Sequence, residues 1–586
     1  MHVVATAGHV DHGKSALVRA LTGTEPDRLA EERRRGLSIQ LGYAWTTLPG
    51  AGEVAFVDVP GHERFISTTL AGLGPVPAVL FVVAADDPWM PQAAEHLAAL
   101  DALGVEHGVL AVTRADLADP GPARERALAE LAATSLRGVP AVAVSARTGG
   151  GLDELRAALA RMVSALPSPP ADAAVGLWVD RSFTVAGAGT VVTGTLPAGR
   201  VAPGDRLASA GTEHRVRAVQ SLGRDVPCAE GVARVALNLA GGAPVARGDV
   251  LVTPGAWHHT DVVDVRVGPP RLGDGPVPQR PVLHLGSTLL TVHHRPLGEG
   301  LARLRLEHPQ PLRVGDRALL RDPGTRRLWA VTVLDPAPPP LGRRGAARAR
   351  AQTLARADGR PDLAAEVARR GMVTAALLER IGVRVAALPP GVVRAGGWLL
   401  DAERVASAAQ EAVAVVQEHA ASAPLDPPLT PAALAERLGL PGPEVARAVV
   451  RAPLRLEAGR VVRDDAADVP AEVRTAVAAL RERLGEAPFA APAADELPAL
   501  GLDAKAQAAA VRAGLVLRPA PGVVLLAGAD DLAAERLAAL PQPFTVSEAR
   551  RHLGTSRRVV LALLAHLDRT GRTRRLPDDR RRVTGR

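Results

Sequence analysis

A chain of 586 residues is too long for one hydrophobic core, so we expect four or more domains. The single Cys228 excludes a disulfide framework and a thiolate metal site, and no apolar run is long enough to cross a membrane. The formal net charge is +8, and positions 541–586 alone carry an equal excess, with twelve Arg against four acidic residues. We therefore expect a monomeric cytoplasmic protein with no membrane partner, neutral over its first 540 residues and basic at its end.

The first 170 residues alternate strand-like and helix-like segments. The stretch "HVVATAGHVDHGKSALVRALTG" reads as a strand, a glycine-containing loop and a helix. Strand-like runs return at "VAFVDVP", "VLFVVAA", "GVLAVTRAD" and "AVAVSA", separated by helical stretches such as 90–104 and 122–137. This alternation predicts an α/β domain over 1–170, with a mostly parallel sheet covered on both faces.

Short Val- and Thr-rich runs broken by Gly and Pro follow, with turn signals about every ten residues. They predict antiparallel β-barrels, which we place at 174–265 and 266–336. The proline-rich segment 335–344 then reads as a stiff, exposed linker.

The remainder of the chain is helical and repeats. "LTPAALAERLGLPGPEVARAVV" at 429–450 aligns with "FTVSEARRHLGTSRRVVLALL" at 544–564 at a constant offset of 115. Each segment has a capping residue, an amphipathic helix ending in Leu-Gly, a short turn and a second helix, which is typical of a helix-turn-helix. We expect four tandem winged-helix (α+β) modules, of which only the last is strongly basic, at 345–402, 403–466, 467–528 and 529–586.

A phosphate-binding loop is predicted between the first strand and the first helix. "GHVDHGKS" satisfies G-x-x-x-x-G-K-[ST] in that strand-to-helix context, and Lys14 is one of only two lysines in the chain. Lys14 should reach the outer phosphates and Ser15 should ligate Mg²⁺. "DVPGHE" at 58–63 places Asp58 near a Mg²⁺ water and Gly61 where its N–H can sense a γ-phosphate. The predicted loop residues are Gly8, His9, Val10, Asp11, His12, Gly13, Lys14 and Ser15.

These motifs resemble the translational GTPases. The resemblance implies that His62 orients the attacking water, and that Val10 and Ile39 form an apolar gate beside it. It also implies that Ser38, in "RRRGLSIQLGY", joins Ser15 and Asp58 at Mg²⁺. "TRAD" stands where these proteins have N-K-x-D, so the residues expected at guanine are Thr113, Arg114 and Asp116, with Ser145 and Ala146 of "VSA".

The chain also resembles the bacterial selenocysteine-specific elongation factors. The resemblance lies in the domain order and in two segments, "DRSFTVAGAGTVVTGTLPAG" at 180–199 and "RVALNLAG" at 234–241. This resemblance runs through the whole chain, most weakly at 270–530. It implies GTP with Mg²⁺ as ligands, and Asp180, Arg181 and Arg234 lining a pocket for the aminoacyl group of selenocysteinyl-tRNA. It further implies delivery to the ribosome at UGA codons marked by an mRNA hairpin, the SECIS element, held by the last winged helices.

Independently of any resemblance, the positive charge of residues 541–586 suits an RNA partner. Phe544 precedes a helix cap and reads as a core residue, which favours a structured hairpin over a stacked single strand. A solvated basic tail, chiefly 578–586, is the alternative reading. A general aminoacyl- or initiator-tRNA carrier and a nucleotide-gated DNA-binding regulator also stay open as functions. The predicted RNA contacts are Arg550, Arg551, Arg557, Arg558, Arg572, Arg574 and Arg575.

Overall fold

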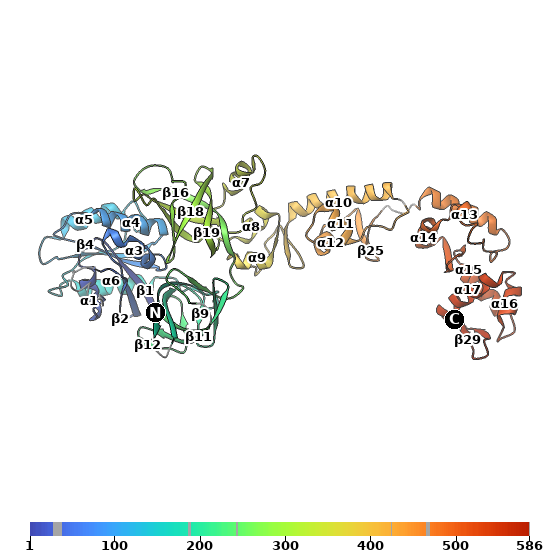
Figure 1. Ribbon diagram of the computed structural model, residues 1–586, viewed down its shortest axis with the longest axis horizontal. Helices are drawn as coiled ribbons and strands as arrows, with labels where there is room; N and C mark the ends of the chain where they lie inside the picture. Colours follow the sequence, from blue (N-terminus) through green and yellow to red (C-terminus); the bar gives the residue numbers. More distant parts are fainter. Residues whose placement is uncertain (27–37, 186–188, 242–243, 424, 465–468, 585–586) are drawn as a thin grey trace. The chain divides into compact units, whose positions relative to one another are not determined.

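The computed structural model describes residues 1–26, 38–185, 189–241, 244–423, 425–464 and 469–584, and it divides into two compact units (Figure 1). Unit 1 comprises Met1–Arg369 and Val373–Pro389, and unit 2 comprises Arg370–Met372 and Pro390–Arg586. The predicted fold class is confirmed: an α/β domain precedes two antiparallel barrels and a series of winged-helix modules. The seven domain boundaries stay a prediction.

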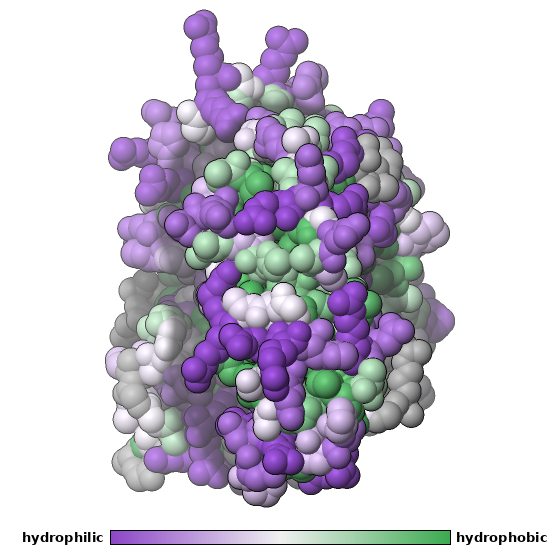
Figure 2. Space-filling view, turned by 90° about the vertical axis from the view of Figure 1, so that its right-hand side faces the viewer, coloured by the Kyte–Doolittle hydropathy of each residue, from purple (hydrophilic) through white to green (hydrophobic). Residues whose placement is uncertain are grey.

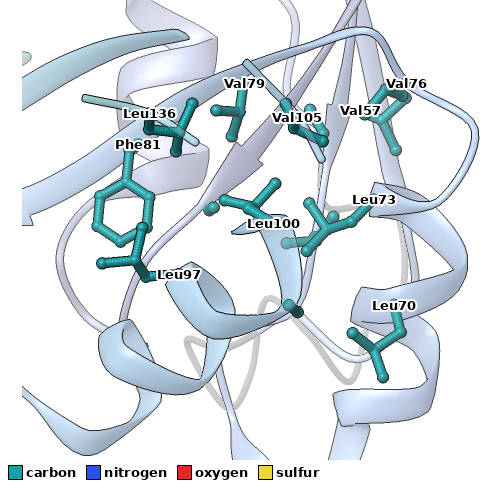
Figure 3. Packing of buried hydrophobic residues seen from close by; sticks show 14 of the residues in the cluster. Val57, Leu70, Leu73, Val76, Val79, Phe81, Leu97, Leu100, Val105 and Leu136 are labelled. Carbon is teal, nitrogen blue, oxygen red and sulfur yellow. The ribbon is translucent and has the colours of Figure 1, made fainter. Parts of the chain in front are cut away.

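The N-terminal domain is a six-stranded sheet in the order β2-β3-β1-β4-β5-β6, in which only β2 runs antiparallel to its neighbour. Every residue of β4 is buried, as expected for a strand covered on both faces. In Figure 3, side chains of α3 and α4 such as Leu73 and Leu100 pack towards the sheet residues Val57 and Val79. The elements are β1 (His2–Ala7), α1 (Lys14–Thr22), β2 (Gly42–Leu48), β3 (Gly52–Asp58), η1 (Glu63–Phe65), α3 (Ile66–Leu73), β4 (Ala78–Ala84), α4 (Pro91–Leu103), β5 (His107–Thr113), α5 (Gly121–Leu131), β6 (Ala141–Ala143) and α6 (Leu152–Ser164).

The first of the two barrels forms the second domain, and we call it barrel 2; the next is barrel 3. Barrel 2 closes because its sheet, in the order β10-β15-β7-β8-β14-β11, also pairs β10 with β11. Buried and exposed residues alternate along β11, so one set of side chains fills the interior. Its strands are β7 (Gly176–Val185), β8 (Gly189–Leu196), β9 (Arg200–Val201), β10 (Arg206–Ser209), β11 (Thr212–Ser221), β12 (Arg224–Asp225), β13 (Ala229–Glu230), β14 (Ala233–Ala240) and β15 (Val250–Val252).

Barrel 3 is a closed six-stranded barrel in the order β16-β19-β18-β17-β20-β21. Its first strand begins at His259, on the N-terminal side of the boundary predicted at residue 266. The strands are β16 (His259–Leu272), β17 (Val282–Leu285), β18 (Thr288–Gly298), β19 (Leu301–Pro311), β20 (Arg317–Arg321) and β21 (Leu328–Asp335).

The helical part begins with α7, which packs on barrel 3, and continues through both units. Its first elements are α7 (Ala346–Leu354), α8 (Leu363–Arg370), β22 (Met372–Thr374), α9 (Ala375–Arg380), β23 (Val392–Ala395) and β24 (Trp398–Asp401). The next module holds α10 (Ala402–Ser422), α11 (Pro431–Leu438), α12 (Pro443–Val449), β25 (Leu454–Glu457) and β26 (Arg460–Arg463). The last two hold α13 (Ala471–Leu484), η2 (Pro498–Leu500), α14 (Ala504–Arg512), β27 (Val516–Ala520) and β28 (Val523–Leu526), then α15 (Ala529–Ala538), α16 (Val546–His552), α17 (Arg557–Arg569), β29 (Thr573–Arg575) and β30 (Arg581–Val583).

The predicted helix-turn-helix repeat is confirmed by equivalent caps. Thr430 caps α11 and Thr545 caps α16, the latter with Glu548 in a full capping box. Phe544 is 1% exposed and belongs to the core, as predicted. Within the described ranges, no helix combines the length and the apolar character needed to cross a membrane. The face at the C-terminal end carries mostly hydrophilic side chains, with small separate hydrophobic areas (Figure 2).

Candidate nucleotide, aminoacyl and RNA sites

The phosphate loop is a tight turn that is hydrogen-bonded to α4. Gly8, Asp11 and Gly13 have positive φ angles of 131°, 66° and 82°. A Cβ on Gly8 would lie 2.1 Å from the Val82 carbonyl oxygen, so only glycine fits there. The Gly8 N–H donates to Nδ1 of His96 over 3.0 Å, and this bond fixes the start of the loop.

Oxygen atoms gather where the loop enters α1. Ser15 Oγ donates to Asp58 Oδ2 over 2.6 Å and lies 3.1 Å from Ser38 Oγ. Burial raises the pKa of Asp58, while hydrogen bonds from Ser15 and Thr6 act in the opposite direction. Two hydroxyls beside a carboxylate are the hard oxygen ligands that Mg²⁺ takes, so the three predicted metal residues fit that ion.

Lys14 and the turn after β3 lie against the loop. Lys14 Nζ donates to the carbonyls of Gly8 and His9 over 3.1 and 2.7 Å. A Cβ on Gly61 would lie 2.4 Å from Lys14 Nζ and 2.5 Å from the Val10 nitrogen, so this turn touches the loop directly. His62 is half-exposed, and its Nδ1 accepts from the Arg64 N–H over 3.2 Å. The segment "RRRGLSIQLGY" at 33–43 resembles the first switch of translational GTPases, and its residues 33–37 lie outside the described residues.

The unusual guanine box supports the phosphate loop through its first two residues. Thr113 Oγ1 donates to the His12 carbonyl over 2.7 Å. Arg114 donates to the Asp11 carbonyl and pairs with Asp86 at 3.1 Å. The structure therefore uses this threonine and arginine to hold the loop in shape.

Asp116, the predicted guanine acceptor, has a partner that the sequence analysis missed. Arg147 Nε donates to Asp116 Oδ2 over 2.9 Å, and its Nη2 lies 2.8 Å from the same oxygen. Ser145 and then Arg147 lower the pKa of Asp116. Asp116 lies at the protein surface, and the Arg147 side chain that pairs with it is 75% exposed. The sequence does carry a signal for Arg147 as this partner: it is a basic residue directly after the motif "VSA", which ends at Ala146.

Three histidines surround the loop in uncharged form. Burial lowers the pKa of His12 to about 4 and that of His96 to about 3, and it also lowers the pKa of His9. The rings of His9 and His12 meet edge to face at 5.0 Å, and His12 Nε2 lies 3.2 Å from Asp87. Neutral imidazoles add no positive charge beside Lys14 at neutral pH.

The predicted aminoacyl residues meet at the junction of the GTP-binding domain and barrel 2. Arg234 forks onto both oxygens of Asp180, with Nη2 to Oδ1 at 2.6 Å. Thr193 Oγ1 donates to Asp180 Oδ1 over 2.7 Å and accepts from Arg234 Nη2 over 3.0 Å. The carboxylate therefore neutralises and orients one of the two arginines.

Tyr43 of β2 is a fourth member of this site that the sequence analysis did not identify. The guanidinium carbons of Arg234 and Arg181 lie 4.0 and 4.8 Å from its ring centroid. Arg181 also donates to the Leu41 carbonyl, within the segment "RRRGLSIQLGY" that contains Ser38. These side chains line a cavity of about 240 Å³, with Phe183 at its edge. Two guanidiniums against one carboxylate give the site a local charge of +1.

The seven predicted RNA-binding arginines divide into two groups. Arg558 donates to the carbonyls of Pro492 and Ala491, over 2.7 and 3.3 Å, and to that of Gly522, so it joins the last two modules. Arg572 pairs with Asp530 at 3.3 Å and with Asp531, and Arg575 pairs with Asp579. Of the seven, Arg550, Arg551, Arg557 and Arg574 are exposed and form no ion pair with a carboxylate within the described part of the chain.

Comparison with known proteins agrees with this geometry at both ends of the chain. Residues 1–165 match the family model of the elongation factor Tu GTP binding domain, and residues 535–582 match that of the elongation factor SelB winged helix. A crystal structure of a bacterial selenocysteine-specific elongation factor, EF-Sec, aligns over 100% of both chains with a TM-score of 0.78 at 24% identity, which supports the fold alone. The phosphate loop, the elongation factor Tu type of domain and the two barrels define a translational GTPase.

The curated relatives narrow this class. The chain is 36% identical over 420 residues to the selenocysteine-specific elongation factor of Escherichia coli K12, covering 68% of this chain and 67% of that one. It is 37% identical over 336 residues to that of Desulfomicrobium baculatum, covering 54% of this chain and 53% of that one. The alignments thus span between about half and two thirds of these relatives. The chain belongs to the family of selenocysteine-specific elongation factors.

Replacing Arg147 with alanine should strengthen guanine binding. Guanine N1–H and N2–H₂ need the carboxylate that Arg147 contacts, and exposed ion pairs are weak, so GDP and GTP should bind about two- to fivefold more tightly. Inosine nucleotides lack the N2 amine and should gain less. Fluorescent-nucleotide titration measures both, with Arg137→Ala as a control at an exposed arginine. Weaker GTP binding by Arg147→Ala would show that Arg147 helps to hold the base.

His96→Gln should reduce the acid sensitivity of the GTP-binding domain. The folded-state pKa of His96 is lowered to about 3, so its contribution to stability is present above its unfolded pKa of about 6.5 and is lost as the pH falls towards 3. Between pH 7.5 and 5.5 the parent should lose about 1 kcal/mol more unfolding free energy than the variant. Calorimetry of the full chain at both pH values measures this difference. Equal losses would mean that His96 does not titrate differently in the two states.

Proposed function

We propose that this protein is a cytoplasmic, monomeric elongation factor that binds GTP and selenocysteinyl-tRNA and delivers the tRNA to the ribosome. Its C-terminal modules would hold an mRNA hairpin, the SECIS element, that marks the UGA codon. The observation that carries this proposal is the pocket lined by Arg181, Arg234 and Tyr43, in which Asp180 holds Arg234. It combines charge, burial and a cavity of about 240 Å³ beside the GTP-binding domain.

The nucleotide site would act as a switch that hydrolyses GTP on the ribosome. Ser15, Ser38 and Asp58 would hold Mg²⁺, which neutralises phosphate charge when it is bound. The turn carrying Gly61 and His62 already contacts the phosphate loop. We assign to His62 the positioning of the attacking water, because its half-exposed imidazole belongs to the turn that contacts the phosphate loop.

The aminoacyl pocket would select selenocysteine by charge. A selenol is more acidic than a thiol and is ionised at neutral pH, whereas serine carries a neutral hydroxyl of similar reach. An apolar pocket separates such similar groups by only about 1–3 kcal/mol. Asp180 neutralises Arg234, so Arg181 supplies the uncompensated positive charge. A selenolate would complement this charge, and a hydroxyl would not.

The basic end would hold the message through phosphate contacts. Arg550, Arg551 and Arg557 lie around the start of α17, and Arg574 lies on the hairpin that follows. Exposed arginines on a helix and a neighbouring wing suit phosphates on the two sides of a duplex groove. Arg558 is better explained as a link that orients the last two modules.

The two rival functions explain fewer features. A general or initiator-tRNA carrier accounts for the GTP-binding domain and the barrels, but gives no role to the winged helices. A DNA-binding regulator uses the winged helices, but gives no role to an arginine-lined pocket on a barrel. Comparing how tightly the full chain binds hairpin RNA and duplex DNA separates the DNA-binding regulator from our proposal.

Arg181→Ala should weaken binding of selenocysteinyl-tRNA in the GTP state by about one to three decades, through loss of the charge that a selenolate needs. Seryl-tRNA binding, already weak, should change little, and Arg181→Lys should recover part of the loss. Filter binding with both charged tRNAs measures this. Arg206→Ala, on the exposed surface of barrel 2, is the matched control. Equal losses for both tRNAs would mean that Arg181 holds the tRNA body.

A further inference from the structure

We propose that a second basic surface, on α7, binds the phosphate backbone of the carried tRNA. We call it the α7 ridge; it consists of Arg343, Arg344, Arg348 and Arg356. This inference rests on the proposed function, because it takes the aminoacyl-tRNA as the ligand of the same unit. Figure 1 shows α7 on the outside of barrel 3.

The ridge is at a helix, α7, that is held on barrel 3 by hydrophobic packing and by hydrogen bonds at the C-terminal end of the helix. Leu354 is fully buried against Leu297 and Leu301 of the barrel. Arg266 of β16 donates to the carbonyls of Ala355 and Ala357, over 3.2 and 2.8 Å, and so satisfies the C-terminal end of the helix. The helix therefore presents its outer face in a set orientation.

A buried ion network fixes the same helix at its centre. Arg350 Nε donates to Asp264 Oδ2 over 2.7 Å, and its Nη2 reaches Asp335. Arg303 forks onto Asp264 at 2.6 and 2.9 Å and also donates to the Pro339 carbonyl over 2.9 Å, which holds the segment before α7. The network contains equal numbers of acidic and basic groups, with Arg369 and Glu366 completing it. It supplies no spare negative charge to the ridge.

The ridge itself has an uncompensated positive charge. No Asp or Glu occurs between Asp335 and Asp358, a stretch that contains five arginines. Four of these are exposed, and Arg350 alone is buried. Within the described ranges, none of the four pairs with a carboxylate. Four guanidiniums in the turn before α7, on it and just after it suit a polyanion, because phosphates accept forked hydrogen bonds from arginine.

The position of the ridge identifies which RNA it suits. The residues of α7, barrel 3 and the aminoacyl pocket all lie in unit 1, whereas the basic last module lies in unit 2. If one ligand occupied both the pocket and the ridge, it would have to join an aminoacyl group to a long phosphate backbone. The carried tRNA has that chemistry, and an mRNA hairpin lacks the aminoacyl group. Arg348 lies on the packed helix itself, so it loses less freedom on binding than an arginine of a mobile chain would.

The test is tRNA binding by full-length Arg343→Ala/Arg344→Ala/Arg348→Ala at several salt concentrations. With a non-hydrolysable GTP analogue present, selenocysteinyl-tRNA should bind with a salt slope smaller in magnitude by about two to three, because each phosphate that an arginine neutralises contributes about 0.9. At 0.15 M salt, binding should weaken about fivefold for each arginine that no longer reaches a phosphate. Affinity for the mRNA hairpin should not change. The thermal unfolding midpoint should also stay constant, because the three side chains are exposed.

The matched control is Arg124→Ala/Arg137→Ala/Arg161→Ala, which removes three exposed charges from the GTP-binding domain. A ridge variant with the tRNA salt slope of this control would overturn the proposal. Loss of hairpin affinity with unchanged tRNA binding would also overturn it, and would assign the ridge to the message. If the parent protein binds no selenocysteinyl-tRNA at all, the proposed function itself fails, which is a distinct result.

Discussion

Carboxylates paired with arginine, most of them buried, lie where the parts of unit 1 meet. A buried charge without a partner is costly, and a forked guanidinium can satisfy both oxygens of a carboxylate at once. The chain has only two lysines, and arginine supplies the cation of every pair named below. The pairs are Asp180–Arg234 beneath Tyr43, Glu95–Arg321 and Asp101–Arg271 between α4 and barrel 3, and Asp264 and Asp335 with Arg303 and Arg350 beneath α7.

The same chemistry connects the nucleotide site to the rest of unit 1. Adjacent residues of α4 reach in different directions: His96 accepts the first N–H of the phosphate loop, and Glu95 pairs with Arg321 at 3.5 Å. The proposed aminoacyl pocket also lies across a junction, because Tyr43 comes from the GTP-binding domain and Arg234 from barrel 2. A helix and a strand of one domain thus take part directly in the surfaces of its neighbours.

Local patterns predicted the elements and several of the site residues. The phosphate loop could be recognised because its glycines, lysine and serine are contiguous, and the winged helices because their capping residues repeat. The partner of Asp116 and the role of Tyr43 could not be predicted, since both depend on segments that meet only in the folded chain. Arg558 shows the same limit: its charge is visible in the sequence, but its bond to Pro492 requires two modules to be packed together. The overall charge count also concealed the α7 ridge, because acidic residues elsewhere balance it.

The central claim is that a positively charged pocket at the junction of two domains recognises an ionised selenol. The most direct test is the affinity of the GTP-bound protein for selenocysteinyl-tRNA and for seryl-tRNA from neutral to acidic pH. Protonation removes the negative charge of the selenolate and leaves the serine hydroxyl as it was. We expect the preference for selenocysteinyl-tRNA to decline as the selenol becomes protonated, while seryl-tRNA affinity stays nearly constant. A preference that does not change with pH would contradict charge selection.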